Sequence, residues 1–74
     1  MKQLEEKVSI GEYIKRLRFF EKLHQWELGE KIGVTQVTIH NWESGKSEPA
    51  TKHLAKMNQV LGWEFDLDKI ITNK

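Results

Sequence analysis

The sequence predicts an all-α domain of about four to five helices, and three observations lead to this prediction. Apolar residues recur at steps of three and four positions through most of the chain, which is the period of a helix packed on one side. Glycines follow the points where these runs stop, as they do after helix C-termini. The chain has 74 residues and no cysteine, which suits one small domain without disulfides or thiolate metal sites.

The first predicted helix follows a polar segment. Residues 1–9 are charged and polar without a usable period, and we expect a flexible N-terminus there. The pattern then predicts a helix over residues 10–21, with Ser9 as its N-cap and Glu12 completing a capping box. The apolar stripe of this helix consists of Ile10, Ile14, Leu17 and Phe20.

Residues 25–45, QWELGEKIGVTQVTIHNWESG, contain the next two predicted helices and the turn between them. Thr35 is a good N-cap for the second of these helices, because its hydroxyl accepts a bond from a free N–H of the first turn. The inward positions are Leu28 and Ile32 in the first helix and Ile39 and Trp42 in the second.

This stretch carries two glycines, Gly29 and Gly33, only four residues apart. Glycine inside a helix costs about 0.5–1 kcal/mol relative to alanine, so both positions need a reason. Two short helices joined by a tight turn cross steeply, and a small residue is required where they cross. Gly29 supplies that residue, and Gly33 supplies the positive φ at which the turn begins. The pair of glycines therefore predicts a helix-turn-helix.

A fourth helix is predicted to open at Pro49 or Ala50, since proline suits a first helical turn, and to stop at Gly62. Its apolar face is formed by Leu54, Met57, Val60 and Leu61.

The helix-turn-helix motif, counted from Gln25, requires a small fifth residue, glycine at position nine, and apolar residues at positions four, eight, ten, fifteen and eighteen. This chain supplies all of them: Leu28, Gly29, Ile32, Gly33, Val34, Ile39 and Trp42. Together with Leu17-Arg18, Gln25 and the WESGKSEP ending, they resemble the Cro/phage-repressor (XRE) family over residues 10–62. The resemblance implies a compact lambda-repressor-like domain that binds DNA.

The resemblance also implies a structural ion pair between Arg18 and Glu43. Three positions depart from the family pattern. Lys22 stands where glycine is frequent, Gly29 replaces the usual alanine, and Asn58 occupies a commonly apolar position.

The third helix is predicted to read DNA bases. With Ile39 and Trp42 facing inward, its short polar side chains face outward, and these are what a major groove accepts. Taken singly, Gln36 and Asn41 would be ordinary solvated positions, and the surrounding motif favours a base-reading role. The predicted base-reading residues are Gln36, Val37, Thr38, His40 and Asn41.

Contacts to the DNA backbone fix register without reading sequence. Gln25, at the start of its helix, is the first candidate, because helix N-termini favour anions. The full predicted set is Gln25, Thr35, Ser44, Lys46 and Lys52. Beside Gln25, Trp26 fits two alternatives, packing on a DNA sugar or covering the core.

After Gly62 the period changes to that of a strand. Apolar Trp63, Phe65 and Leu67 alternate with acidic Glu64, Asp66 and Asp68. One recognition helix reads few base pairs, and two-fold dimers read half-sites about 34 Å apart. The apolar residues after the last predicted helix exceed what so small a core can bury; they are Trp63, Phe65, Leu67, Ile70 and Ile71. We therefore expect residues 63–74 to serve dimerisation, with an antiparallel pairing of residues 63–67 between two copies that buries Trp63, Phe65 and Leu67. In much of the family, a fifth helix occupies this segment.

These features predict a sequence-specific regulator of transcription that binds double-stranded DNA, most simply a repressor dimer on a palindromic operator. The alternative is an antitoxin whose acidic tail binds a toxin protein while the same domain represses the operon. The family resemblance implies a cytoplasmic protein of bacterial or phage origin. The net charge of +1 is well short of that of a strongly basic nucleic-acid binder.

Other function classes have little support in the sequence. His24, His40 and His53 lack zinc-site spacing, so we expect no metal and no cofactor. There is no plausible catalytic pair and no phosphate-cradling loop, so we expect no enzyme. No run reaches the roughly 18 apolar residues of a membrane span.

Overall fold

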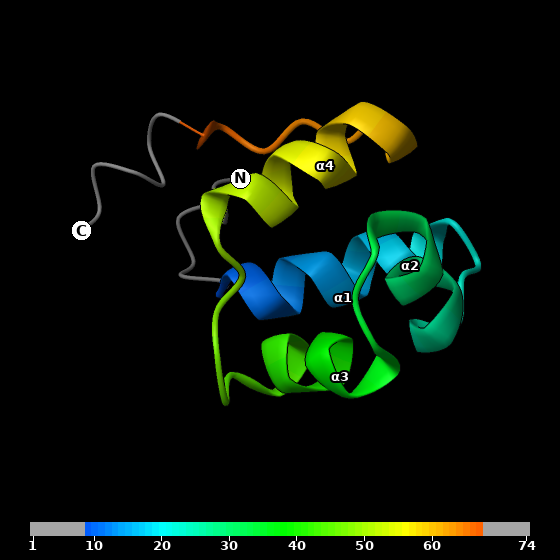
Figure 1. The fold of residues 1–74 in the computed structure, drawn as a ribbon, viewed down its shortest axis with the longest axis vertical. Coiled ribbons are helices and arrows are strands. Elements are labelled where there is room, and N and C mark those ends of the chain that lie inside the picture. The colour runs from blue at the N-terminus through cyan, green and yellow to red at the C-terminus, as the bar shows by residue number, and fades with distance from the viewer. Residues whose placement is uncertain (1–8, 68–74) are drawn as a thin grey trace, which may run out of the picture.

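The computed structural model describes residues 9–67, and these form four helices. The helices are α1 (Ile10–Phe20), α2 (Gln25–Ile32), α3 (Gln36–Ser44) and α4 (Thr51–Leu61). Helix α3 packs against α1 and α2, and α2 also packs against α4. In Figure 1, α1 crosses the centre with α4 above it and α3 below it. The predicted all-α fold is confirmed, whereas the predicted flexible N-terminus falls almost wholly on residues 1–8, outside the described residues.

The helix ends follow from local chemistry. Ser9 caps α1 by accepting a 3.1 Å hydrogen bond from the Glu12 amide. Thr35 caps α3 by accepting a 3.2 Å bond from the Thr38 amide. Gly33 ends α2 with φ 85°, the left-handed conformation predicted for it. Helix α4 begins at Thr51, with Ala50 as its N-cap, so Pro49 precedes the helix and lies buried.

Two glycines allow backbones to touch where α3 meets its neighbours. A Cβ at Gly29 of α2 would lie 2.5 Å from the Val34 carbonyl oxygen, in the turn before α3. A Cβ at Gly11 of α1 would lie within van der Waals overlap of the Trp42 carbonyl of α3. No side chain fits at either place without a backbone shift, so α3 is fixed by backbone contact on two sides.

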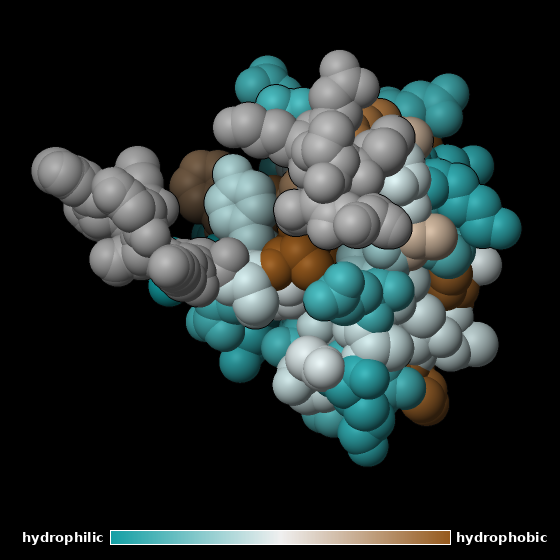
Figure 2. Space-filling model, turned by 90° about the vertical axis from the view of Figure 1, so that its left-hand side faces the viewer, coloured by the Kyte–Doolittle hydropathy of each residue, from teal (hydrophilic) through white to brown (hydrophobic). Residues whose placement is uncertain are grey.

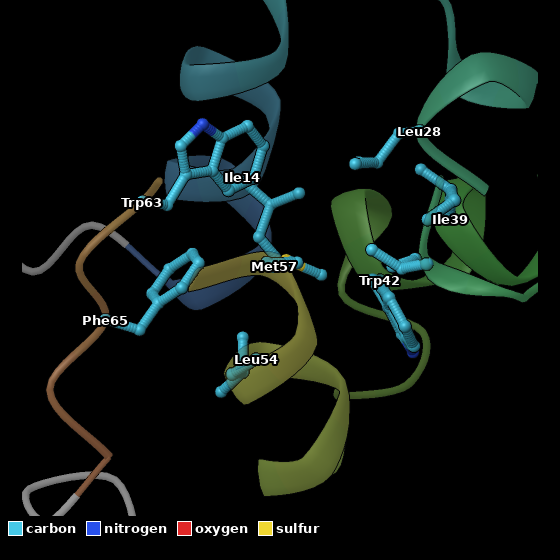
Figure 3. Close-up of a cluster of buried hydrophobic side chains, with 9 residues drawn as sticks. Ile14, Leu28, Ile39, Trp42, Leu54, Met57, Trp63 and Phe65 are labelled. Carbon is cyan, nitrogen blue, oxygen red and sulfur yellow. The ribbon is translucent and has the colours of Figure 1, made fainter. Parts of the chain in front are cut away.

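The core is built from every helix and from the segment after α4. Ile14, Leu28, Ile39 and Met57 have no exposed surface, and Leu54 is equally central. Figure 3 shows Trp63 and Phe65 projecting from the C-terminal segment toward Ile14 and Met57. Each of these two aromatic residues is only 7% exposed. The segment therefore completes the core that the helices begin.

Residues 62–66 form no strand, and Leu67, the last described residue, is helical. The alternation of Trp63 and Phe65 with acidic residues instead separates an inward from an outward side of an extended segment. The expectation that these two aromatic side chains exceed what the core can bury is wrong, because the chain buries both itself. Leu67 is also partly buried against the same core. Asp68, Ile70 and Ile71 lie outside the described residues.

Asn58 of α4 holds this segment in place. The Phe65 amide donates to Asn58 Oδ1 at 2.8 Å, and Asn58 Nδ2 donates to the Phe65 carbonyl at 3.1 Å. We call this pair the Asn58–Phe65 clasp. One carboxamide thus satisfies both backbone groups of a residue, as a neighbouring strand would. The polar residue at this commonly apolar position therefore has a structural reason.

Candidate nucleic-acid interface

Two large side chains anchor helix α3 to the core. Ile39 is completely buried and Trp42 is 4% exposed. The Trp42 ring also packs against the His53 ring of α4, with 5.0 Å between centroids. These contacts and the caps at Thr35 and Gly45 fix the rotation of α3 about its own axis. The same face is therefore presented outward throughout the helix.

The outward face of α3 carries the residues predicted to read bases. Gln36, Val37 and His40 are exposed, and Val37 retains 66% of its surface. Thr38 and Asn41 are half-buried along the edges of this face. Donors, acceptors and one apolar group are thus grouped within two turns of a helix, the combination that distinguishes base pairs in a major groove.

The residues predicted to contact the DNA backbone fall into two groups. Lys46 and Lys52 are exposed, one in the loop after α3 and the other near the start of α4. Thr35 and Ser44 are exposed but have local partners: the Thr35 hydroxyl caps α3, and Ser44 Oγ donates to the Asn41 carbonyl at 3.3 Å. The lysines can therefore reach a phosphate directly, whereas the two hydroxyls already contribute to the helix ends.

Arg18, Glu43 and Gln25 join three helices in one polar network. Arg18 Nε lies 2.6 Å from Glu43 Oε2, and Arg18 Nη2 donates to Glu43 Oε1 at 2.9 Å. Arg18 Nη1 donates to the Leu23 carbonyl at 2.8 Å, and Gln25 Nε2 donates to Glu43 Oε1 at 3.0 Å. The side chains of the ion pair are 8% and 4% exposed. The ion pair of this Arg18–Glu43 network is bidentate and almost completely shielded from water.

The predicted phosphate contact of Gln25 assumed that its side chain has no protein partner. In the structure this side chain is bonded to Glu43. The Gln25 side chain is half-buried and its amide nitrogen is held by Glu43 of α3. An amide group has two N–H donors, so one remains for a phosphate while the other keeps the bond to Glu43. The network thus orients Gln25 as well as joining α1 to α3.

Gly11 was not singled out from the sequence, and Lys22 only as a departure from the family pattern, yet both shape this interface. Gly11 brings α1 onto the backbone of α3, and the signal was a glycine in a first helical turn, where it costs stability. Lys22 adopts φ 61°, and the signal was the frequent glycine of the family at that position. Its left-handed turn brings the Leu23 carbonyl to Arg18.

On the face shown in Figure 2, hydrophilic and intermediate residues predominate among the coloured atoms, and hydrophobic residues form separate small patches. Within residues 9–67, no three His, Asp or Glu side chains converge as metal ligands would. None of the helices in that range has the length and apolar content needed to cross a bilayer.

Comparisons with known proteins identify the same helix-turn-helix. Residues 14–67 match the helix-turn-helix family model. YonR of Bacillus subtilis, described as an SPbeta prophage-derived uncharacterized HTH-type transcriptional regulator, is 30% identical over 74 residues, covering 85% of this chain and 68% of that protein. The HTH-type transcriptional regulator DicA of Escherichia coli is 35% identical over 54 residues, or 73% of this chain and 40% of DicA.

A eukaryotic protein is also similar to this chain. Multiprotein-bridging factor 1 of Candida albicans is 36% identical over 55 residues, which cover 74% of this chain and 36% of that protein. The chain thus spans less than half the length of both this factor and DicA. No solved structure matches the chain.

Proposed function

The chain belongs to the Cro/C1-type (XRE) helix-turn-helix family of DNA-binding transcriptional regulators, and we propose that it is a repressor that occupies a palindromic operator as a dimer. In this proposal α3 enters the major groove and blocks access to a promoter. The bacterial relatives support a cytoplasmic protein of bacterial or phage origin.

The observation that carries the proposal is the anchoring of α3. Ile39 and Trp42 fix its inner side, so that Gln36, Val37 and His40 are held outward on its N-terminal half. Gln36 is suited to paired hydrogen bonds with adenine, and Val37 to contact with a thymine methyl. Thr38, His40 and Asn41 complete the proposed reading face.

The proposed backbone contacts surround this reading face. Lys46 and Lys52 bind phosphates through exposed ammonium groups, and Thr35 and Ser44 add contacts at the two ends of α3. Gln25 uses the amide hydrogen that Glu43 leaves available. These groups set the register of α3 on the duplex and do not choose the sequence.

The test is a selection of duplexes from a random pool, followed by binding measurements on two variants. Gln36→Ala is expected to lose about 1–3 kcal/mol at the selected site and to relax preference at one position. Lys46→Ala is expected to weaken all duplexes about equally and to lower the salt slope by about 1. Gln59→Ala, an exposed glutamine of α4, serves as the matched control. Failure to enrich any sequence contradicts the proposal, and equal behaviour of the two variants contradicts the assigned roles.

The dimer is tested separately by sedimentation of the full chain with the selected duplex. Two chains per palindromic site are expected, and one chain per site would contradict the proposal. Dimerisation through Trp63, Phe65 and Leu67 stays a prediction, and strand pairing there would require the Asn58–Phe65 clasp to share Phe65 with a second copy. Truncation after Gly62 is unsuitable as a test, because it removes two core aromatic residues.

A second candidate function is that of an antitoxin. Trp63 and Phe65 are buried, whereas Glu64 and Asp66 are exposed along the same segment, which gives an acidic edge suited to a basic protein partner. Coexpression with the product of a neighbouring gene tests this function. A stoichiometric complex that is lost in the double variant Glu64→Lys/Asp66→Lys supports it, provided that DNA binding is retained.

A further inference from the structure

Trp26 stands apart from the other two tryptophans of the chain. Trp42 and Trp63 are 4% and 7% exposed, whereas Trp26 retains 49% of its surface. Trp26 is thus not among the buried or partly buried hydrophobic side chains of the core cluster. Of the two alternatives open for this residue from the sequence, covering the core thus accounts for at most about half of the indole surface, and the rest is open to a ligand.

The exposed indole lies beside one other ring. The Trp26 ring lies nearly parallel to the His24 ring, with 10° between the planes and 6.3 Å between centroids. His24 is the N-cap of α2, and its amide donates to Glu27 Oε1 at 2.7 Å. A neighbouring ring limits the rotation of the indole, so less conformational entropy is lost when a ligand covers it, which favours binding.

The position of Trp26 on α2 places it beside the reading helix. Gly29 lies three residues further along α2, and residues three apart are neighbours on a helix surface. Gly29 faces the turn before α3, where a Cβ would meet the Val34 carbonyl oxygen at 2.5 Å and the Thr35 carbonyl carbon at 3.3 Å. On the preceding residue, the Gln25 side chain bonds to Glu43 of α3. Trp26 thus borders the α2–α3 surface.

We propose that Trp26 packs its indole face against the deoxyribose of the strand that borders the groove read by α3. The inference rests on the proposed DNA-binding function and adds an uncharged contact to it. The indole offers a broad apolar face that suits the carbon face of a sugar. Every nucleotide presents that face, so the contact adds affinity for duplex DNA without selecting a sequence.

The first experiment uses the fluorescence of the unmodified chain, because only one of its three tryptophans is substantially exposed. Acrylamide, an uncharged quencher, is titrated into the free protein and into the protein saturated with a mixed-sequence duplex of about 30 base pairs. We expect the accessible emission of Trp26 to be protected on binding. Emission from Trp26→Phe should be poorly quenched in both states, because its remaining tryptophans are buried.

The second experiment measures affinity for the same duplex. Trp26→Ala should bind about tenfold more weakly, whereas Trp26→Phe, which keeps an aromatic face, should stay within about threefold of the parent. Phe20→Ala is the matched control, since it removes an aromatic residue that is 82% exposed on α1, and it should change affinity little. The dependence of affinity on salt should be unchanged in Trp26→Ala, because no charge is lost.

The outcomes separate this inference from the proposed function. Duplex binding with an accessible Trp26, or with full affinity in Trp26→Ala, overturns the sugar contact and leaves the function standing. Equal losses in Trp26→Phe and Trp26→Ala also overturn it, because the indole N–H would then carry the contact. If the parent protein binds neither this duplex nor any duplex selected from the random pool, the proposed function itself is overturned. Thermal melts of each variant test whether it is folded. The quenching experiment on the parent protein does not depend on any variant.

Discussion

Two polar contacts join different segments of this chain, and they differ in charge. The Arg18–Glu43 network links α1 to α3 through a bidentate ion pair with both side chains more than nine-tenths buried. The Asn58–Phe65 clasp ties the C-terminal segment to α4 through a neutral amide. The ion pair fixes two rigid helices at one separation and angle. The amide matches the single donor and single acceptor of an extended residue.

The difference between them lies in the cost of losing one partner. A buried guanidinium without its carboxylate is an uncompensated charge in a medium that solvates it poorly. A backbone amide without its partner is neutral, so leaving it unpaired costs less free energy than leaving a charge unpaired. Helix α3 is thus held by the contact whose loss costs more free energy, and the C-terminal segment by the contact whose loss costs less.

The largest expected effect is that of Glu43→Ala. Removing the carboxylate leaves Arg18 buried with the Leu23 carbonyl as its remaining partner in the network, and we expect a loss of about 3–5 kcal/mol in the free energy of unfolding. Gln25 also loses its acceptor. Urea denaturation followed by circular dichroism measures the change. Glu30→Ala, which removes an exposed carboxylate from α2, should shift stability by no more than about 0.5 kcal/mol.

Replacing both partners of the ion pair sharpens this test. The double variant Arg18→Met/Glu43→Leu removes both charges and should recover much of the stability lost in Glu43→Ala. If the single and double variants are equally unstable, the loss comes from packing and the argument from an unpaired charge is wrong.

The second effect concerns the Asn58–Phe65 clasp. Asn58→Ala leaves the amide and carbonyl of Phe65 without the side chain that pairs with them, and we expect a loss of about 1–3 kcal/mol. Asn58→Asp keeps the acceptor but turns an oxygen toward the Phe65 carbonyl, so it should destabilise at least as much. Faster hydrogen exchange of the Phe65 amide in Asn58→Ala, measured by NMR, localises the effect.

The control for this prediction is Gln59→Ala, which changes the exposed neighbouring amide of α4. It should leave both the stability and the Phe65 exchange rate unchanged. A clasp variant as stable as the parent would show that the burial of Trp63 and Phe65 alone holds the segment.

The elements that the sequence predicted well depend on short-range chemistry. Leu28, Ile32, Ile39 and Trp42 face inward because helical period alone assigns their side. Gly33 ends α2 because a left-handed residue is needed at that one position. Each of these choices is settled within a few residues, so a single sequence is enough to predict it.

The C-terminal segment was harder to predict, because alternation has more than one structural meaning. A strand at a dimer edge and an extended segment lying on a core both direct Trp63 and Phe65 to one side. The structure differs from the strand prediction because the side chain of Asn58, seven residues away, occupies both backbone groups of Phe65. Pairing of this kind depends on tertiary contacts, which the periodicity of the sequence does not encode.

The features of the candidate site also divide into those that the sequence predicted and those that it did not. The exposure of Gln36, Val37 and His40 followed from the period of α3. The bond from Gln25 to Glu43 did not, because it depends on how close α2 and α3 approach. That approach is set by the contact of Gly29 with the Val34 carbonyl. The period of the sequence thus predicts which face of α3 is exposed, but not the bond that orients Gln25 on the neighbouring helix.

The smallest expected effect is that of a substitution at Lys22, in the turn whose Leu23 carbonyl accepts a bond from Arg18. Lys22 adopts φ 61°, which strains a residue with a Cβ, while the amides of Lys22 and Leu23 donate to the Phe19 and Arg18 carbonyls at 3.0 Å. Glycine removes the strain and keeps these bonds, so Lys22→Gly should stabilise the protein by about 0.5–1 kcal/mol. That gain corresponds to a rise in Tm of about 2–8 °C for a domain of this size.

The matched control is Lys15→Gly, which makes the same chemical change at an exposed position inside α1. There glycine should destabilise by about 1 kcal/mol, because it loosens a helix instead of relieving a left-handed turn. Opposite signs for the two variants would show that backbone strain at Lys22, and not the loss of a lysine, sets the result. Equal signs would mean that the turn carries no strain, and that the Leu23 carbonyl reaches Arg18 without conformational cost.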